Sequence, residues 1–285
     1  MYETVNQTNL YYEEFGNGNR VILACGQHFD YDKIGWPFDL AEEGFHVIVL
    51  TMRGYGKSSH IYENFEQNWY DIWADDIAAF ATAKGISHFF YTGQSDGAGI
   101  GWHLCLRHPE RLVGFAGLAA GPHSRSTWHG NDVRRQNIDA VSNPDVAEQL
   151  AQYQRQRIFH FSKKFKDDPI LKKEFEEKAM KAYNWQLNKT PEEKLINPGI
   201  TLPQFHTDKA LLEALKNISF PVLLLNGMKD AMLPFSSTVP VMGVIPEAKV
   251  IYYQEATNFI QYDRRNDVRR EIAVFAAEAF DKAGL

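Results

Sequence analysis

The chain has 285 residues, of which 44% are hydrophobic and 13% aromatic, and its formal net charge is −6. This length and apolar content suit one large domain, or one domain with an insertion, and the negative charge excludes nucleic-acid binding through a basic surface. The two cysteines, Cys25 and Cys105, are isolated, so the sequence predicts no disulfide framework and no zinc cluster. Because the sequence shows no apolar leader and no run of 18 apolar residues, we expect a cytoplasmic protein without a membrane contact.

The first part of the chain alternates short apolar strands with helical patterns. Near-continuous apolar runs such as residues 20–24 are typical of parallel strands that are buried on both faces. The alternation predicts an α/β fold, a doubly wound and mostly parallel sheet. Strands are expected over residues 9–15, 20–24, 46–50, 88–91 and 112–118, and helices over residues 36–43 and 68–84.

The character of the sequence changes between residues 123 and 206. Continuous apolar strands disappear there, and helical segments rich in charged and aromatic residues replace them. We predict that residues 123–206 form a helical lid inserted into a core made of residues 1–122 and 207–285. Within the lid, helices are expected over residues 131–141, 145–165, 168–186 and 191–196. After it, the core is expected to resume with a helix over 208–216, strands over 221–227 and 249–253, and a helix over 266–282.

The most informative motif is Gly93-Gln94-Ser95-Asp96-Gly97. An apolar strand precedes it and a helical pattern follows, which is the context of a nucleophile elbow. Such a turn strains the serine backbone and requires small neighbours, here Gly93 and Gly97. It also aims the N–H of Asp96 and the start of the helix toward a developing oxyanion. The motif therefore predicts Ser95 as a catalytic nucleophile.

Further motifs stand in the same order as in a known family. They are Cys25-Gly26-Gln27, the loop Arg53-Gly54-Tyr55-Gly56-Lys57-Ser58, the elbow, and Gly227-Met228-Lys229-Asp230. With them the chain resembles the lid-bearing branch of the α/β-hydrolase family over nearly its full length. The resemblance implies Asp230 as the acid of a catalytic triad, and it implies an oxyanion hole made by the N–H groups of Gln27 and Asp96. Members that open epoxides or remove halides have aspartate at the elbow, so Ser95 favours acyl transfer instead.

The pattern breaks at the position of the family's catalytic histidine, where this chain has Asn258. No histidine follows His206, so a shifted alignment does not supply one. An asparagine amide cannot take a proton from Ser95 near neutral pH, although it can donate a hydrogen bond to Asp230. Three interpretations remain open: an inactivated variant of a serine hydrolase, a ligand-binding pseudohydrolase or receptor, and an enzyme that uses another base such as His28 or His123.

The resemblance implies a small-molecule substrate and no metal or cofactor. Esters, lactones, amides and some carbon–carbon bonds are all cleaved by this machinery, and an aromatic lid suits a bulky, partly apolar substrate. The side chain of Asp96 is expected either to face the pocket or to cap the helix that follows Ser95. The sequence leaves the oligomeric state open. The residues expected to contact the substrate are His28, Trp36, His123, Trp128, Tyr183 and Trp185.

Overall fold

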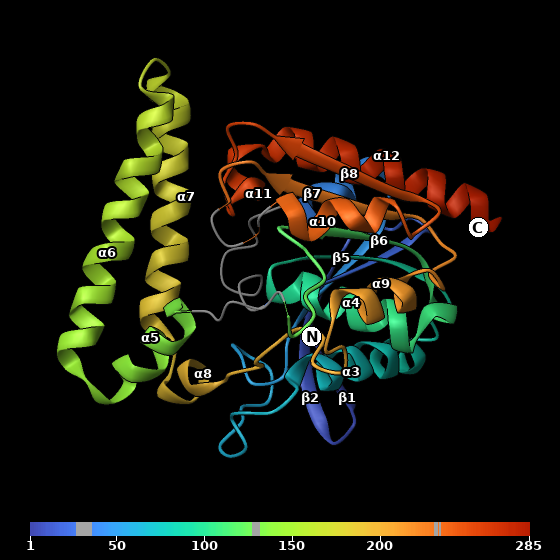
Figure 1. Cartoon of the computed structure of the whole chain (residues 1–285), viewed down its shortest axis with the longest axis horizontal. Coiled ribbons are helices and arrows are strands. Elements are labelled where there is room, and N and C mark those ends of the chain that lie inside the picture. The colour runs from blue at the N-terminus through green and yellow to red at the C-terminus, as the bar shows by residue number, and fades with distance from the viewer. Residues whose placement is uncertain (27–35, 127–131, 231–232, 234) are drawn as a thin grey trace.

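The structure is a computed structural model that describes residues 1–26, 36–126, 132–230, 233 and 235–285. A twisted sheet lies at its centre with helices on both faces, and a pair of long helices stands beside this body (Figure 1). The described strands form one eight-stranded sheet in the order β1-β2-β4-β3-β5-β6-β7-β8. They are β1 (Tyr2–Val5), β2 (Thr8–Phe15), β3 (Val21–Gly26), β4 (His46–Thr51), β5 (Phe89–Gln94), β6 (Leu112–Leu118), β7 (Val222–Gly227) and β8 (Ala248–Tyr253).

The sheet is mostly parallel, as predicted. The β1–β2 and β2–β4 pairs are antiparallel, and every pairing from β4 through β3, β5, β6 and β7 to β8 is parallel. The carboxyl ends of the parallel strands therefore meet at one edge of the sheet. In open α/β sheets this edge is where ligands bind.

Side chains of each central strand alternate between two separate apolar cores. In β3, Leu23 and Cys25 belong to the core under α3 and α4, whereas Ile22 and Ala24 belong to the core under α12. The strands are consequently apolar at nearly every position, which is why they read as continuous runs. The helices around the sheet are α2 (Trp36–Asp39), α3 (Trp69–Ala83), α4 (Asp96–Arg107), α9 (Asp208–Leu215), α10 (Phe235–Met242), α11 (Ile260–Asp263) and α12 (Arg265–Ala283), with short 3-10 helices at Leu40–Glu43 and Pro109–Arg111.

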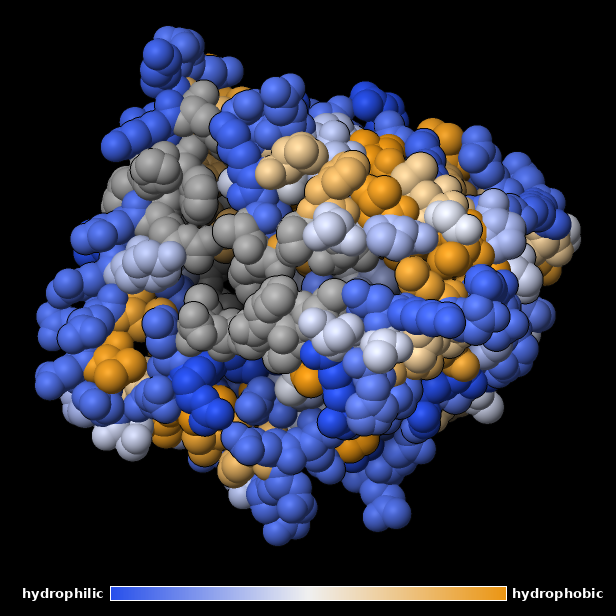
Figure 2. Space-filling view, in the orientation of Figure 1, coloured by the Kyte–Doolittle hydropathy of each residue, from blue (hydrophilic) through white to orange (hydrophobic). Residues whose placement is uncertain are grey.

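Residues 132–195, here called the helical segment, lie between β6 and β7 in the chain. The long helices α6 and α7 run side by side and return to the same end, where α5 and α8 join them to the main body (Figure 1). The outer surface of this pair is mainly hydrophilic (Figure 2). The helical segment contains α5 (Asp132–Ser142), α6 (Pro144–Ser162), the 3-10 helix Lys163–Phe165, α7 (Pro169–Asn188) and α8 (Pro191–Leu195).

Several contacts fasten the helical segment, and the chain on either side of it, to the core. The N–H of Gly56 donates to Glu193 Oε1 at 2.6 Å, and the N–H of Asn197 donates to Phe65 O at 2.9 Å. Where the chain leaves and re-enters the core, the N–H of Arg125 donates to Phe205 O at 2.9 Å. The helical segment is thus joined to the core at more than one point near the sheet edge.

Candidate active site

Ser95 occupies a strained turn between β5 and α4. Its backbone has φ 51° and ψ −113°, a positive φ that residues with a side chain rarely adopt. Ser95 is exposed, whereas the glycines on either side, Gly93 and Gly97, are buried. The strand, the turn and the helix therefore hold Ser95 at the sheet edge with its side chain open to solvent.

The two glycines are required because the backbone of the turn packs on itself and on β3. A Cβ atom at Gly93 would lie 2.4 Å from the carbonyl of Gly97, and one at Gly97 would lie 2.3 Å from Cys25 O. Two hydrogen bonds fix the turn from below: the N–H of Ser95 donates to Leu118 O at 3.1 Å, and Tyr91 Oη donates to Gly97 O at 2.8 Å. These bonds tie the turn to β6 and β5, while the close approach of Gly97 to Cys25 O sets it against the end of β3.

Cys25 lies at this contact but is not a nucleophile. Burial raises the pKa of its thiol far above the ordinary value, with Asp76 adding to the effect. The thiolate needed for attack is therefore absent near neutral pH. Gln27, the second expected oxyanion donor, lies outside the described residues.

Asp230 and Asn258 meet near the carboxyl ends of β7 and β8. Asn258 Nδ2 donates to Asp230 Oδ2 at 2.9 Å, and the N–H of Leu233 donates to Asp230 Oδ1 at 3.2 Å. Gln94, which precedes Ser95, donates from Nε2 to Asn258 O at 3.1 Å. The structure thus brings the acid and the asparagine to the same edge as the serine, and the loop of Asn258 is tied to the residue before Ser95.

Asp96 is the first residue of α4. Its Oδ1 accepts from Tyr70 Oη at 2.8 Å and from Arg134 Nη2 of α5 at 2.7 Å. Tyr70 lies on α3, so the carboxylate joins two core helices to the helical segment. Burial raises the pKa of Tyr70 far above its ordinary value, and the Asp96 carboxylate raises it further, so the phenol stays a donor.

A lysine lies close to the same carboxylate. Tyr55 lies in the loop that follows β4, and Lys189 Nζ is 5.2 Å from the centre of its ring. Burial lowers the pKa of the Lys189 ammonium to about 7, although the carboxylates of Asp96 and Glu193 oppose the shift. Lys189 is partly exposed as a whole residue, but its charged end lies inside the protein, and the titration belongs to that end.

The residues expected to contact a substrate lie in different parts of the structure. Trp36 is 1% exposed and donates from Nε1 to Thr92 Oγ1 at 3.1 Å, so it packs in the core. Tyr183 uses its hydroxyl to bind Ala151 O of α6 at 3.1 Å, which joins the two long helices. His123 is partly buried on the segment that follows β6. His28, Trp128 and the side chain of Trp185 lie outside the described part of the structure.

His103, the histidine of α4, has a structural place. It is fully buried, its Nε2 contacts Thr201 O, and its Nδ1 lies 2.5 Å from the carboxylate of Asp71. Both ring nitrogens therefore face groups away from the Ser95 turn, and His103 is not a candidate base.

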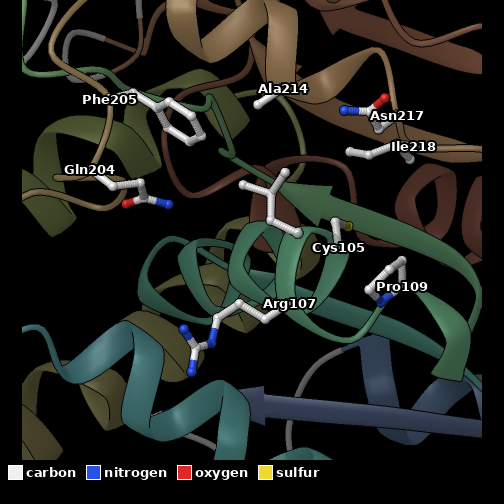
Figure 3. Close-up of a pocket in the computed structure, with 9 residues that line it drawn as sticks. Cys105, Arg107, Pro109, Gln204, Phe205, Ala214, Asn217 and Ile218 are labelled. Carbon is white, nitrogen blue, oxygen red and sulfur yellow. The ribbon is translucent and has the colours of Figure 1, made fainter.

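The cavity in Figure 3 is distinct from the Ser95 edge. It has a volume of about 350 Å³ and lies at the opposite end of α4, beside the segment that precedes α9. Cys105, Phe205 and Ile218 are among its lining residues, and burial raises the pKa of the Cys105 thiol well above its ordinary value. The cavity thus combines apolar surface and an inert thiol with the polar side chains of Arg107, Gln204 and Asn217.

The described residues offer neither a metal-binding cluster nor a membrane-spanning helix. No cluster of three or more histidine, cysteine or acidic side chains there could hold a metal ion. Among the helices in the same residues, none combines the length and the apolar character needed to cross a membrane.

Sequence reasoning missed Tyr70, Arg134, Lys189 and Glu193. Each is far from Ser95 in sequence, and the two cations, Arg134 in α5 and Lys189 just after α7, stand in a part of the chain whose many charges read as solvated faces. The only signal in the sequence was the aspartate that follows the nucleophile, since a buried carboxylate requires donors.

Comparison with known proteins agrees with this geometry. A family profile described as the alpha/beta hydrolase fold matches residues 25–264. The AB hydrolase superfamily protein YisY of Bacillus subtilis is 24% identical, with 96% of this chain and 97% of that protein covered. The bifunctional esterase/perhydrolase DCH of Acinetobacter calcoaceticus is 22% identical, with 95% and 97% covered. Among solved structures, the meta-cleavage product hydrolase CumD of Pseudomonas fluorescens has a TM-score of 0.72 at 18% identity, with 96% of each chain covered.

Proposed function

Since the chain belongs to the α/β hydrolase fold family and is a hydrolase, we propose that it is a serine hydrolase. It would work through an acyl-Ser95 intermediate, and Asn258 would stand in place of the histidine base. The substrate would be a small, partly apolar ester, lactone or amide, or a compound with an activated carbon–carbon bond. The names of similar proteins, an esterase/perhydrolase and a meta-cleavage product hydrolase, are consistent with this range.

One observation carries the proposal: the hydrogen bond from Asn258 Nδ2 to Asp230 Oδ2 at 2.9 Å. In a triad the acid accepts a hydrogen bond from one imidazole nitrogen and so orients the ring toward the nucleophile. The asparagine amide makes the same donation to the acid but has no basic nitrogen. The pair therefore supports a site in which acid and nucleophile remain while the base is replaced.

The remaining groups have clear roles in acyl transfer. A base at position 258 would take the proton of Ser95 Oγ as the oxygen attacks the carbonyl carbon, and would return it to the leaving group. The N–H groups at the start of α4, that of Asp96 first, would stabilise the negative oxygen of the tetrahedral intermediate. Water would then release the acyl group. Without the base, Ser95 is a weak nucleophile, so we infer that this chain binds substrate and turns it over slowly.

We also propose that residues 123–206 act as the lid of this site. The contact of α5 with the start of α4 supports this, because Arg134 of α5 donates to Asp96, the residue that follows Ser95. A substrate would lie between this segment and the carboxyl ends of the strands.

A ligand-binding pseudohydrolase is the second candidate. The observation in its favour is that the Asp230 carboxylate already accepts hydrogen bonds from Asn258 and Leu233, so the site is satisfied without an imidazole. An enzyme with another base, His28 or His123, is the third.

Substitution of Asn258 by histidine separates these candidates. The assay follows hydrolysis of p-nitrophenyl esters and lactones by the chain, by Asn258→His, and by Asn258→His combined with Ser95→Ala. Loss of the catalytic histidine costs about 10⁶ in kcat in a well-studied serine protease, so we expect Asn258→His to raise turnover by about 10³-fold or more and Ser95→Ala to abolish the gain. Brisk turnover by the unchanged chain would indicate another base. An inert Asn258→His variant, with tight ligand binding by the unchanged chain, would favour the pseudohydrolase.

A further inference from the structure

The contact between Arg134 and Asp96 joins the helical segment to the nucleophile turn. Arg134 Nη2 lies 2.7 Å from Asp96 Oδ1, and Arg134 Nη1 donates to Gly199 O at 3.3 Å. The two side chains are only 16% and 13% exposed. Of the contacts that fasten the helical segment to the core, this one reaches the residue next to Ser95.

The pair is costly to break because it is largely buried. Removing one partner of such a pair leaves the other charge uncompensated in a region of low dielectric. Burial by itself would lower the pKa of the Arg134 guanidinium, yet the Asp96 carboxylate raises it above its ordinary value. The guanidinium therefore keeps its charge and its geometry across the working range of pH.

The core side of the contact is rigid. Tyr70, which donates to the same carboxylate oxygen, packs edge-on against Trp73 with ring centres 5.7 Å apart and stacks on His103 at 5.9 Å. The Asp96 carboxylate is thus held between a fixed phenol of α3 and a guanidinium delivered by α5. Since Asp96 is the first residue of α4, restraining its side chain also restrains the backbone N–H that heads the helix.

We propose that Arg134 is a positioning residue: it binds Asp96 and thereby holds the oxyanion-binding N–H in place, so that docking of the helical segment completes the oxyanion hole. This inference rests on the proposed function for its catalytic part. Its structural part, the coupling of α5 to the first turns of α4, stands independently.

Hydrogen–deuterium exchange on the full chain tests the structural part without any turnover. Arg134→Met should accelerate exchange both in α5 and in residues 95–102, by about tenfold or more. Arg135→Met is the matched control, because Arg135 is exposed on the same helix, and it should leave residues 95–102 unchanged. Faster exchange in α5 alone would overturn the proposal, because Arg134 would then only anchor its own helix.

Kinetics in the Asn258→His background test the catalytic part. Arg134→Met should lower kcat about tenfold or more with KM within about twofold, since a displaced oxyanion donor weakens transition-state binding more than substrate binding. Arg134→Lys should recover part of the loss. In an Asp96→Ala background the effect of Arg134→Met should largely vanish, because either substitution removes the same interaction between the two side chains. An equal effect in both backgrounds, or a change in KM alone, would overturn the positioning role.

The two experiments fail separately. If Asn258→His shows no activity, the proposed function fails while the exchange measurement still decides the coupling. Suppose that Arg134→Met leaves exchange unaltered, and that the double variant Asn258→His, Arg134→Met has the same kcat as Asn258→His. The proposed function then stands, and the proposed role of Arg134 is wrong.

Discussion

The backbone conformation of Ser95 depends on its glycine neighbours more directly than on any polar contact. The positive φ at Ser95 brings the start of α4 onto the end of β3, and the space left at Gly97 is too small for a methyl group. The sequence pattern predicted this requirement at Gly93 and Gly97 from turn geometry alone. The identity of the atom in the way, the backbone oxygen of Cys25, follows only from the fold.

Replacing Gly97 by alanine should therefore destabilise the protein. Its Cβ would lie 2.3 Å from a backbone oxygen that no side-chain rotation can move, and overpacking of this kind costs about 1–3 kcal/mol or more. Gly243→Ala is the matched control, because its Cβ would lie an ordinary 3.5 Å from Pro240 O. Urea unfolding of the three proteins measures the difference; equal stability of Gly97→Ala and the unchanged chain would contradict the packing described.

Asn258 shows what residue identity alone can establish. The motif order predicts that it stands at the base position, and in the structure its side chain donates a hydrogen bond to Asp230. Whether the amide impairs turnover is a question of chemistry, which the mutational test above answers.

The helices of the helical segment could be predicted closely because their boundaries carry local signals. Asp168 caps α7 by accepting from the N–H of Leu171, and Thr190 and Glu193 form a capping box on α8. Pairs four residues apart, such as Lys172 with Glu176, agree with a solvated face. What these signals could not give is the direction in which each helix faces, and so the contact of Arg134 with Asp96 was not foreseen.

Two elements lacked such signals. Strand β1 is short and polar, and it forms because β2 offers it an edge. Helix α10 contains Pro240, which disfavours a helix interior, and its ends Phe235 and Met242 are half exposed at 52% and 53%. Both elements owe their existence to tertiary contacts rather than to local pattern.

We expect the free energy of unfolding to depend on pH because of Lys189, which lies at the junction of α7 and α8. The pKa of Lys189 is about 7 in the folded protein, below its ordinary value of about 10.5, because burial disfavours the charged form. Between these two values the unfolded chain binds a proton that the folded chain lacks, so stability should rise with pH by up to about 1.4 kcal/mol per unit. Conversely, the stability falls as the pH drops toward 7.

Lys189→Met isolates this effect. Unfolding free energies of both proteins are measured in urea at pH 7, 8 and 9, and the difference between them removes the contributions of the buried tyrosines and cysteines. We expect the unchanged chain to gain stability relative to Lys189→Met across this range. A constant difference would show that Lys189 keeps its ordinary pKa.

The architecture of the molecule was predictable because it rests on patterns that repeat along the chain. Apolar strands separated by helices specify the parallel order, and all seven expected strands reappear within a few residues as β2, β3, β4, β5, β6, β7 and β8. The assembly of the site was less predictable. Ser95, Asp230 and Asn258 are brought together by strand order, whereas Asp96, Tyr70 and Arg134 meet through helix packing, which leaves no trace in local sequence.

We infer that Ser95 is a nucleophile that lacks only its base. A fluorophosphonate probe reacts with an activated serine, and intact mass followed by peptide mapping reports the rate and the place of labelling. Asn258→His should be labelled at Ser95 at least about 10³-fold faster than the unchanged chain, and the added Ser95→Ala substitution should abolish the labelling. Equal rates in the presence and absence of the histidine, or an adduct on any residue other than Ser95, would contradict the account.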